Sequence, residues 1–272
     1  MTRPPEHLRA RTLAGLALCR TPAPPTAAFA APYAHAVAGL DALLRDLTRA
    51  EWATPVVHGW DVHGTVAHLM AGDGLLCAGA GTPEAVHVPK AARGDWGART
   101  RYVVAVENAR SPHATWGSWH SQAAALLDSD AARHHRDIHL EFAGRHVLLA
   151  DAYLARGFET WLHTDDIGRA VGRRVPDPEP ETMPALVGLG TATLACTYPT
   201  PPAATTLTLT GPGATTTTLG TGVSTAEVTM TTVDFCRLLG GNRRAENLTI
   251  GTDGDPESAT WLLQAIASLA IL

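Results

Sequence analysis

The sequence predicts an α+β protein in which an N-terminal four-helix bundle is followed by a small α+β domain. In the first two-thirds of the chain, apolar residues recur every three or four positions, which is the period of a helix with one buried face. After the proline-rich stretch 176–180, short threonine-rich segments alternate polar and apolar residues, as strands do. At 272 residues the chain is long enough for two domains that each bury a core.

The composition limits the possible partners. A net charge of −5 gives no basic surface for nucleic acid. No apolar stretch is long enough to span a bilayer, and the run Leu13–Cys19 lacks a signal-peptide cleavage site. Lys90 is the only lysine, which is typical of a GC-rich genome. We therefore expect a cytoplasmic monomer or homodimer that binds neither nucleic acid nor membrane.

The chain is expected to have four parts: an N-terminal arm (1–26), the bundle (27–175), a stiff proline-rich linker (176–183) and the C-terminal α+β domain (184–272). Bundle helices are expected at about 27–51, 61–80, 99–127 and 145–171. The third is interrupted near Ser111-Pro112, and Asp61 is expected to cap the second. Segments 81–97 and 128–144 are expected to be irregular.

The C-terminal domain should combine a small sheet with three helices. The expected strands lie at 205–210, 214–219, 223–230 and 247–250. The expected helices lie at 184–195, 234–239 and 256–269.

Three residues form a candidate metal site. Glu159 and His163 lie four positions apart, so on a helix they project from one face, and His68 lies far upstream on another expected helix. Two histidines and one glutamate leave a fourth position open on zinc, as catalytic sites require. Taken singly, a buried histidine or a Glu/His surface pair has an ordinary structural explanation.

Three groups of residues resemble the DinB-like superfamily, in particular the branch named for mycothiol-dependent maleylpyruvate isomerase. They are Gly59-Trp60 with Val66-Ala-His68-Leu69, the segment Glu159-x-x-x-His163-x-x-Asp166, and the C-terminal segments 207–213, 234–239 and 251–255. The order and spacing of these groups resemble the family pattern from about residue 27 to the end of the chain.

The resemblance implies a four-helix bundle that binds a divalent metal, usually zinc, through His68, Glu159 and His163. It also implies a low-molecular-weight thiol, mycothiol, as cosubstrate. We expect Trp60 and Asp166 to contribute to cofactor binding. Trp60 would line the pocket, and Asp166 would either orient a ligand histidine or pair with a basic side chain.

One departure from the family pattern concerns an arginine that is thought to orient substrate carboxylates in the isomerases. The expected Gly-Arg pair is replaced here by the segment 240–244, Gly-Gly-Asn-Arg-Arg. Arg243 and Arg244 are the catalytic candidates, since a guanidinium binds a carboxylate bidentately. A solvated surface position is the competing explanation.

These features favour a metal-dependent enzyme that transfers a thiol onto a small metabolite. Cis–trans isomerisation of maleylpyruvate or a similar diacid is the first alternative. Hydrolysis by metal-bound water and a non-enzymatic zinc-binding regulatory module are the others.

Overall fold

The structure is a computed structural model, and it describes residues 23–93, 95–142 and 144–269. Most of the expected N-terminal arm lies outside these residues. The chain divides into two compact units, 1–176 and 177–272, and each is described separately. The expected domain boundaries, linker included, stay predictions.

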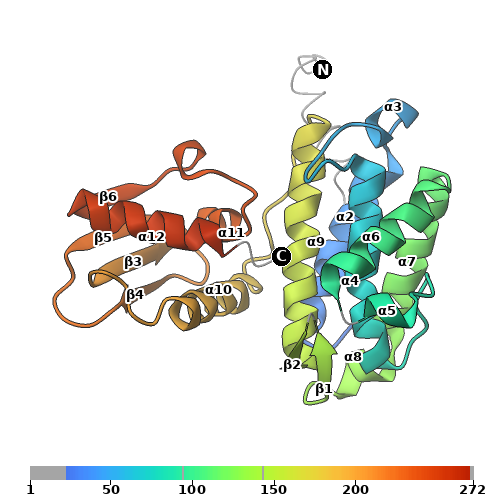
Figure 1. The fold of residues 1–272 in the computed structure, drawn as a ribbon, viewed down its shortest axis with the longest axis horizontal. Coiled ribbons are helices and arrows are strands. Elements are labelled where there is room, and N and C mark those ends of the chain that lie inside the picture. The colour runs from blue at the N-terminus through green and yellow to red at the C-terminus, as the bar shows by residue number, and fades with distance from the viewer. Residues whose placement is uncertain (1–22, 94, 143, 270–272) are drawn as a thin grey trace, which may run out of the picture. The chain divides into compact units, whose positions relative to one another are not determined.

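The first unit is a helical bundle (Figure 1). Helix α9 packs against α2 and α4, and α7 packs against α4 and α2, while α6 covers α4. The long helices are α2 (Ala31–Arg45), α4 (Val62–Ala80), α6 (Trp96–Asn108), α7 (Pro112–Asp128) and α9 (Leu149–Ala170). The shorter elements are α3 (Arg49–Trp52), α5 (Lys90–Arg93), α8 (Asp130–His134), β1 (His139–Phe142) and β2 (Arg145–Leu148).

Helix caps fix where the two central helices begin. Asp61 caps α4 by accepting a hydrogen bond from the Gly64 amide at 2.8 Å, which confirms its expected role. Ser111 caps α7 in the same way, with Pro112 in the first turn, so the expected interruption between α6 and α7 is confirmed.

Three expectations for the first unit were wrong in detail. The first helix ends at Arg45, and α3 starts separately because Thr48 and Glu51 form a capping box. Segment 81–97 contains the short helix α5 and the start of α6. Segment 128–144 contains α8 and β1, and residues 145–148 form β2 instead of the start of the last helix. Strands β1 and β2 pair antiparallel, and Gly144 adopts a positive φ of 76° in the turn between them.

The second unit packs three helices with a four-stranded sheet of order β4-β3-β5-β6. Its elements are α10 (Met183–Thr197), β3 (Thr205–Thr210), β4 (Thr215–Leu219), β5 (Ala226–Thr231), α11 (Thr232–Leu239), a 3-10 turn (Ala245–Asn247), β6 (Gly251–Gly254) and α12 (Pro256–Ser268). Strands β3 and β5 run parallel, and the other pairs are antiparallel.

The predicted α+β class is confirmed, but the expected strand at 247–250 is wrong. The edge strand is β6, whose four residues are all exposed, so it leaves no alternating apolar pattern in the sequence. Its backbone pairing to β5 holds it in place.

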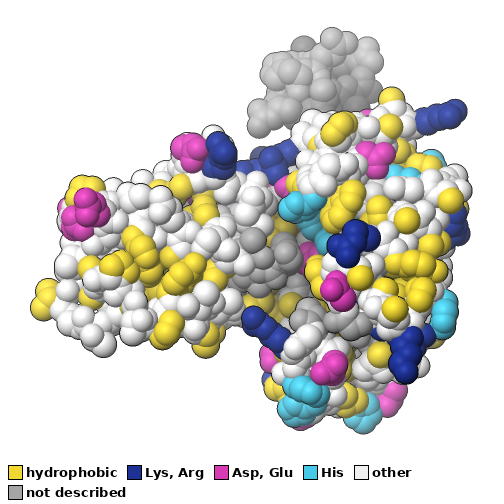
Figure 2. All heavy atoms as spheres, viewed as in Figure 1, with side chains coloured by type: hydrophobic (Ala, Val, Ile, Leu, Met, Phe, Trp, Pro, Cys, Tyr) yellow, Lys and Arg dark blue, Asp and Glu magenta, His cyan; other side chains and the backbone are white. Residues whose placement is uncertain are grey.

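The described helices include none that is both long and apolar enough to cross a membrane. On the face shown in Figure 2, acidic and basic side chains are interspersed over the helical unit.

Helices α2 and α9 approach so closely at Gly157 that a Cβ there would lie 2.7 Å from the Tyr33 backbone nitrogen. We expect Gly157→Ala to lower the free energy of unfolding by about 1–3 kcal/mol, because backbone atoms cannot move aside. Gly39→Ala is the matched control, since nothing lies within 4 Å of its Cβ and alanine should stabilise α2 by about 0.5–1 kcal/mol. Urea denaturation measures both, and equal stability of the two variants would contradict the close approach.

Candidate active site

His68 from α4 meets Glu159 and His163 from α9 in the interior of the bundle. The three side chains are buried, and one potential ligand atom from each lies within 4.8 Å of the others. His68 Nε2 lies 2.8 Å from Glu159 Oε1, and the two imidazole rings are 5.1 Å apart between centroids. The structure therefore brings together the three residues that the sequence singled out.

The donor set fits a divalent cation. Glu159 Oε1 and His68 Nδ1 are buried and form no well-directed hydrogen bond within the described residues. Ligand atoms on one tetrahedral zinc lie roughly 3.3 Å apart, since each bond is about 2.0–2.1 Å. The three side chains, with potential ligand atoms within 4.8 Å of one another, lie close enough to share one cation. Their role as ligands nevertheless stays a prediction.

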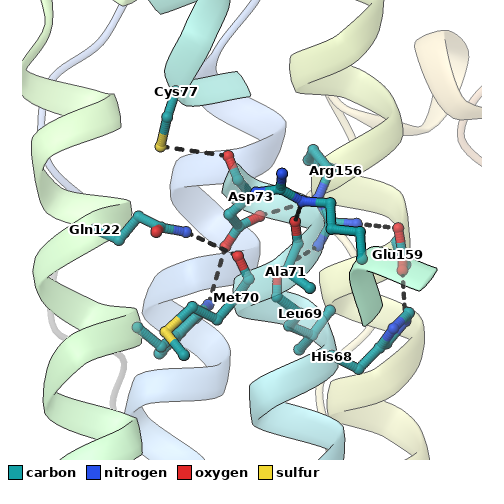
Figure 3. Close-up of polar contacts among 11 residues, drawn as sticks. His68, Leu69, Met70, Ala71, Asp73, Cys77, Gln122, Arg156 and Glu159 are labelled. Carbon is teal, nitrogen blue, oxygen red and sulfur yellow. Dashed lines mark hydrogen bonds and ion pairs between the residues drawn. The ribbon is translucent and has the colours of Figure 1, made fainter. Parts of the chain in front are cut away.

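Arg156 holds Glu159 from the side opposite His68 (Figure 3). The Arg156 guanidinium is fully buried, donates one N–H to Glu159 Oε2, and donates another to Asp73 Oδ1 at 2.9 Å. A third N–H reaches the carbonyl oxygen of Leu69 at 3.1 Å. The Arg156 guanidinium thus links Glu159 of α9 to the backbone and to a carboxylate of α4.

The charge states favour metal binding. Burial alone would raise the pKa of Glu159, but the Arg156 charge and the contact with His68 lower it to about 2. Burial lowers the pKa of the His68 imidazole, and Glu159 only partly opposes this effect. A carboxylate and a neutral imidazole are the forms that bind metals.

Asp166 makes both of the contacts that the sequence left as alternatives, while its part in cofactor binding stays a prediction. Its Oδ2 lies 3.2 Å from His163 Nδ1, and its Oδ1 accepts a hydrogen bond from Arg169. The first contact favours the tautomer in which Nδ1 carries the proton and Nε2 is free to bind a metal.

Two tryptophans border the site. The Trp60 ring stacks on His68 with centroids 4.8 Å apart, and the edge of Trp96 approaches the same imidazole at 5.7 Å. Both rings are partly exposed. Trp60 thus lies beside the site, and its proposed part in cofactor binding stays a prediction.

Arg243 and Arg244 follow α11 in the second unit. Arg244 is exposed and lies 3.5 Å from Glu246, while the Arg243 amide donates to the Arg237 carbonyl oxygen at 3.2 Å. Their catalytic role stays a prediction.

Sequence reasoning missed Arg156 and Asp73, although a signal was present. Two glycines flank Asp73 in the middle of α4, where glycine costs roughly 1 kcal/mol relative to alanine. A Cβ on Gly72 would lie 2.3 Å from an Arg156 nitrogen, and one on Gly74 would lie 2.1 Å from an Arg99 nitrogen. The Gly-Asp-Gly triplet therefore makes room for two buried guanidinium groups.

A comparison with family models matches residues 33–168 to the mycothiol maleylpyruvate isomerase N-terminal domain, which is half of the chain. The chain belongs to this family. The resemblance inferred from the motifs is thereby confirmed.

Two solved structures share the fold. The crystal structure of a mycothiol-dependent maleylpyruvate isomerase has a TM-score of 0.61 and 19% identity, over 84% of this chain and 92% of that one. Its histidine-to-alanine mutant gives a TM-score of 0.60 at 19% identity, over 82% and 91%. No curated protein matches this chain in sequence.

We expect Arg156→Met to destabilise the first unit by about 3–5 kcal/mol, since it leaves Asp73 and Glu159 buried without their cation. Arg133→Met is the control, because Arg133 and its partner Asp128 are largely exposed and such pairs contribute under about 1 kcal/mol. Denaturant unfolding of both variants measures the difference. Similar losses would show that the Arg156 cluster is no more important than a surface ion pair.

Two of the cysteines in the described chain are buried and poor nucleophiles. Burial raises the pKa of Cys77 to about 11 and that of Cys236 to about 12, so both stay protonated at pH 8, whereas Cys196 is exposed. We expect iodoacetamide at pH 8 to modify Cys196 and to spare Cys77 and Cys236 until the protein is unfolded. Peptide mass spectrometry reads the sites, and rapid labelling of Cys77 in the folded protein would refute the assignment.

Proposed function

We propose that this protein is a metal-dependent enzyme that uses mycothiol to isomerise a small cis-unsaturated diacid of the maleylpyruvate type. The observation that carries the proposal is the buried convergence of His68, Glu159 and His163 in a chain of this family. The names of the family and of its structural neighbours also support isomerisation over thiol transfer, which the sequence alone favoured.

Zinc is the metal we propose, because two imidazoles and one carboxylate form a common catalytic zinc set. When bound, zinc would supply a low pKa for an incoming thiol, so that the thiolate is available at neutral pH. The protein's own residues set the charge. Two neutral imidazoles and one carboxylate leave a divalent site at net charge +1, which favours an anionic sulfur.

Arg156 and Asp166 hold two of these side chains in position. Arg156 fixes Glu159 through Oε2 and leaves Oε1 directed at His68. Asp166 fixes the ring of His163 through Nδ1. The single positive charge of Arg156 faces the carboxylates of both Asp73 and Glu159, so the buried cluster stays net negative and favours a cation beside Glu159.

The nucleophile in this proposal comes from outside the chain. Cys77, the buried cysteine on α4, has a raised pKa and donates its S–H to the Asp73 carbonyl oxygen. Addition of an external thiolate to the double bond of a cis diacid, with protonation at the neighbouring carbon, leaves a single bond about which the molecule can rotate. Loss of that proton and of the thiolate then yields the trans diacid and regenerates the thiol.

The test supplies purified protein and zinc with maleylpyruvate and a substoichiometric amount of mycothiol. We expect many turnovers per thiol, and we expect His163→Ala to lose both bound zinc and turnover while its circular dichroism is unchanged. Gly39→Ala is the control and should retain both.

Other outcomes identify the alternatives. Consumption of one thiol per product would indicate thiol transfer. Ester or amide cleavage without thiol would indicate a hydrolase. Tight zinc binding without any turnover would indicate a regulatory module. Full activity of His163→Ala at undiminished metal content would refute the ligand set.

A further inference from the structure

A polar pocket adjoins the candidate metal site at Trp60, which lines the pocket and stacks on His68. It has a volume of about 440 Å³ and lies between the segment before α4, the first turn of α4 and the end of α6. Its lining residues are Pro55, Gly59, Trp60, Asp61, His63, Gly64 and Asn108. This volume falls in the range of small-molecule sites.

A buried hydrogen-bond chain orients one wall of this pocket. Thr115 donates its hydroxyl hydrogen to Glu107 Oε2 at 2.7 Å, and His63 Nε2 lies 2.7 Å from the same hydroxyl oxygen. Because a hydroxyl has a single hydrogen, the Thr115 oxygen must accept from His63 Nε2–H. His63 therefore has its lone pair on Nδ1.

His63 thus presents an acceptor to the pocket. The residue is only 7% exposed, and its Nδ1 forms no hydrogen bond to the described part of the chain. Burial lowers the pKa of the His63 imidazole, which keeps it neutral and its Nδ1 an acceptor at neutral pH. Glu107, fully buried and held by Arg110 at 2.9 Å, fixes the other end of the chain.

The pocket suits a neutral ligand that is rich in hydroxyl groups. Asp61 and His63 offer acceptors, and Asn108 offers an amide that both donates and accepts. The lining contains no lysine or arginine, so an anion would find no counter-charge. Trp60 adds a flat apolar wall against which a sugar ring can pack.

Trp60 itself is held in place from two sides. It stacks on His68 on one side, and the ring of His58 meets it edge-on with centroids 5.6 Å apart. His58 has a φ of 53°, the only positive φ of a non-glycine residue in the described chain. Such strained residues persist where the surrounding structure requires them, and they cluster at binding sites.

We propose that this pocket binds the hydroxyl-rich sugar and inositol part of the thiol cosubstrate, while the sulfur reaches the site on the other side of Trp60. This inference rests on the proposed function. It adds that His63 and Asn108 select for a glycosylated thiol over a simple one such as free cysteine.

The test measures binding of thiol-free N-acetylglucosaminyl-inositol, which is neutral, by calorimetry to metal-free protein. We expect His63→Leu and Asn108→Ala each to weaken binding about 5- to 20-fold, as loss of one buried hydrogen bond does. Asn108 is exposed, so Asn108→Ala should fold even if His63→Leu does not. Ser121→Ala, on an exposed position of α7 outside the pocket, is the control and should bind normally.

The result can separate this inference from the proposed function. His163→Ala should lose zinc and still bind N-acetylglucosaminyl-inositol with unchanged affinity. Asn108→Ala should retain zinc and raise the KM for mycothiol with little change in kcat. Absence of wild-type binding, or binding by both pocket variants with the affinity of the wild type, would overturn the inference even if isomerase activity is present. Tighter binding of inositol alone than of N-acetylglucosaminyl-inositol would assign the pocket to a free polyol and overturn the inference as well.

Discussion

The site depends on one buried guanidinium. Arg156 has no exposed surface, and its three hydrogen-bonding directions end on Glu159, Asp73 and the Leu69 carbonyl oxygen. A cation in this environment is stable only if its partners are held in place. The contact therefore fixes the position of α9 against α4, and with it the distance from His68 to Glu159 and His163.

The glycines of the bundle follow from this contact. Gly72 and Gly74 weaken α4 as an isolated helix, yet each occupies the point where an arginine enters from a neighbouring helix. Gly157, one residue after Arg156, lets α9 lie directly on the backbone of α2. Close packing on one side of α9 and the ion cluster on the other leave little freedom for Glu159 and His163 to move, which is the rigidity that a metal site needs.

The sequence revealed what depends on local spacing. Glu159 and His163 were predictable because helical geometry places positions four apart on one face, and the caps at Asp61 and Ser111 were predictable from side-chain chemistry. The hairpin of β1 and β2 and the edge strand β6 could not be predicted in this way. Their pairing partners are set by backbone geometry and tertiary context, and β6 has no buried side chain to leave a pattern. Arg156 was missed because its partner Asp73 is 83 residues away, a contact that no local window contains.

Trp60 connects the candidate metal site with the polar pocket. One face of its ring lies on His68, and the residue also lines the polar pocket formed with Asp61 and His63. Asp61 lines the pocket and also caps α4, and His68 lies two turns later on the same helix. The start of α4 therefore sets the position of His68 relative to the pocket wall. A ligand that packs against Trp60 would therefore be placed at a fixed distance from His68. A thiol with a sugar attached could use this distance to position its sulfur, whereas a small thiol would gain nothing from it.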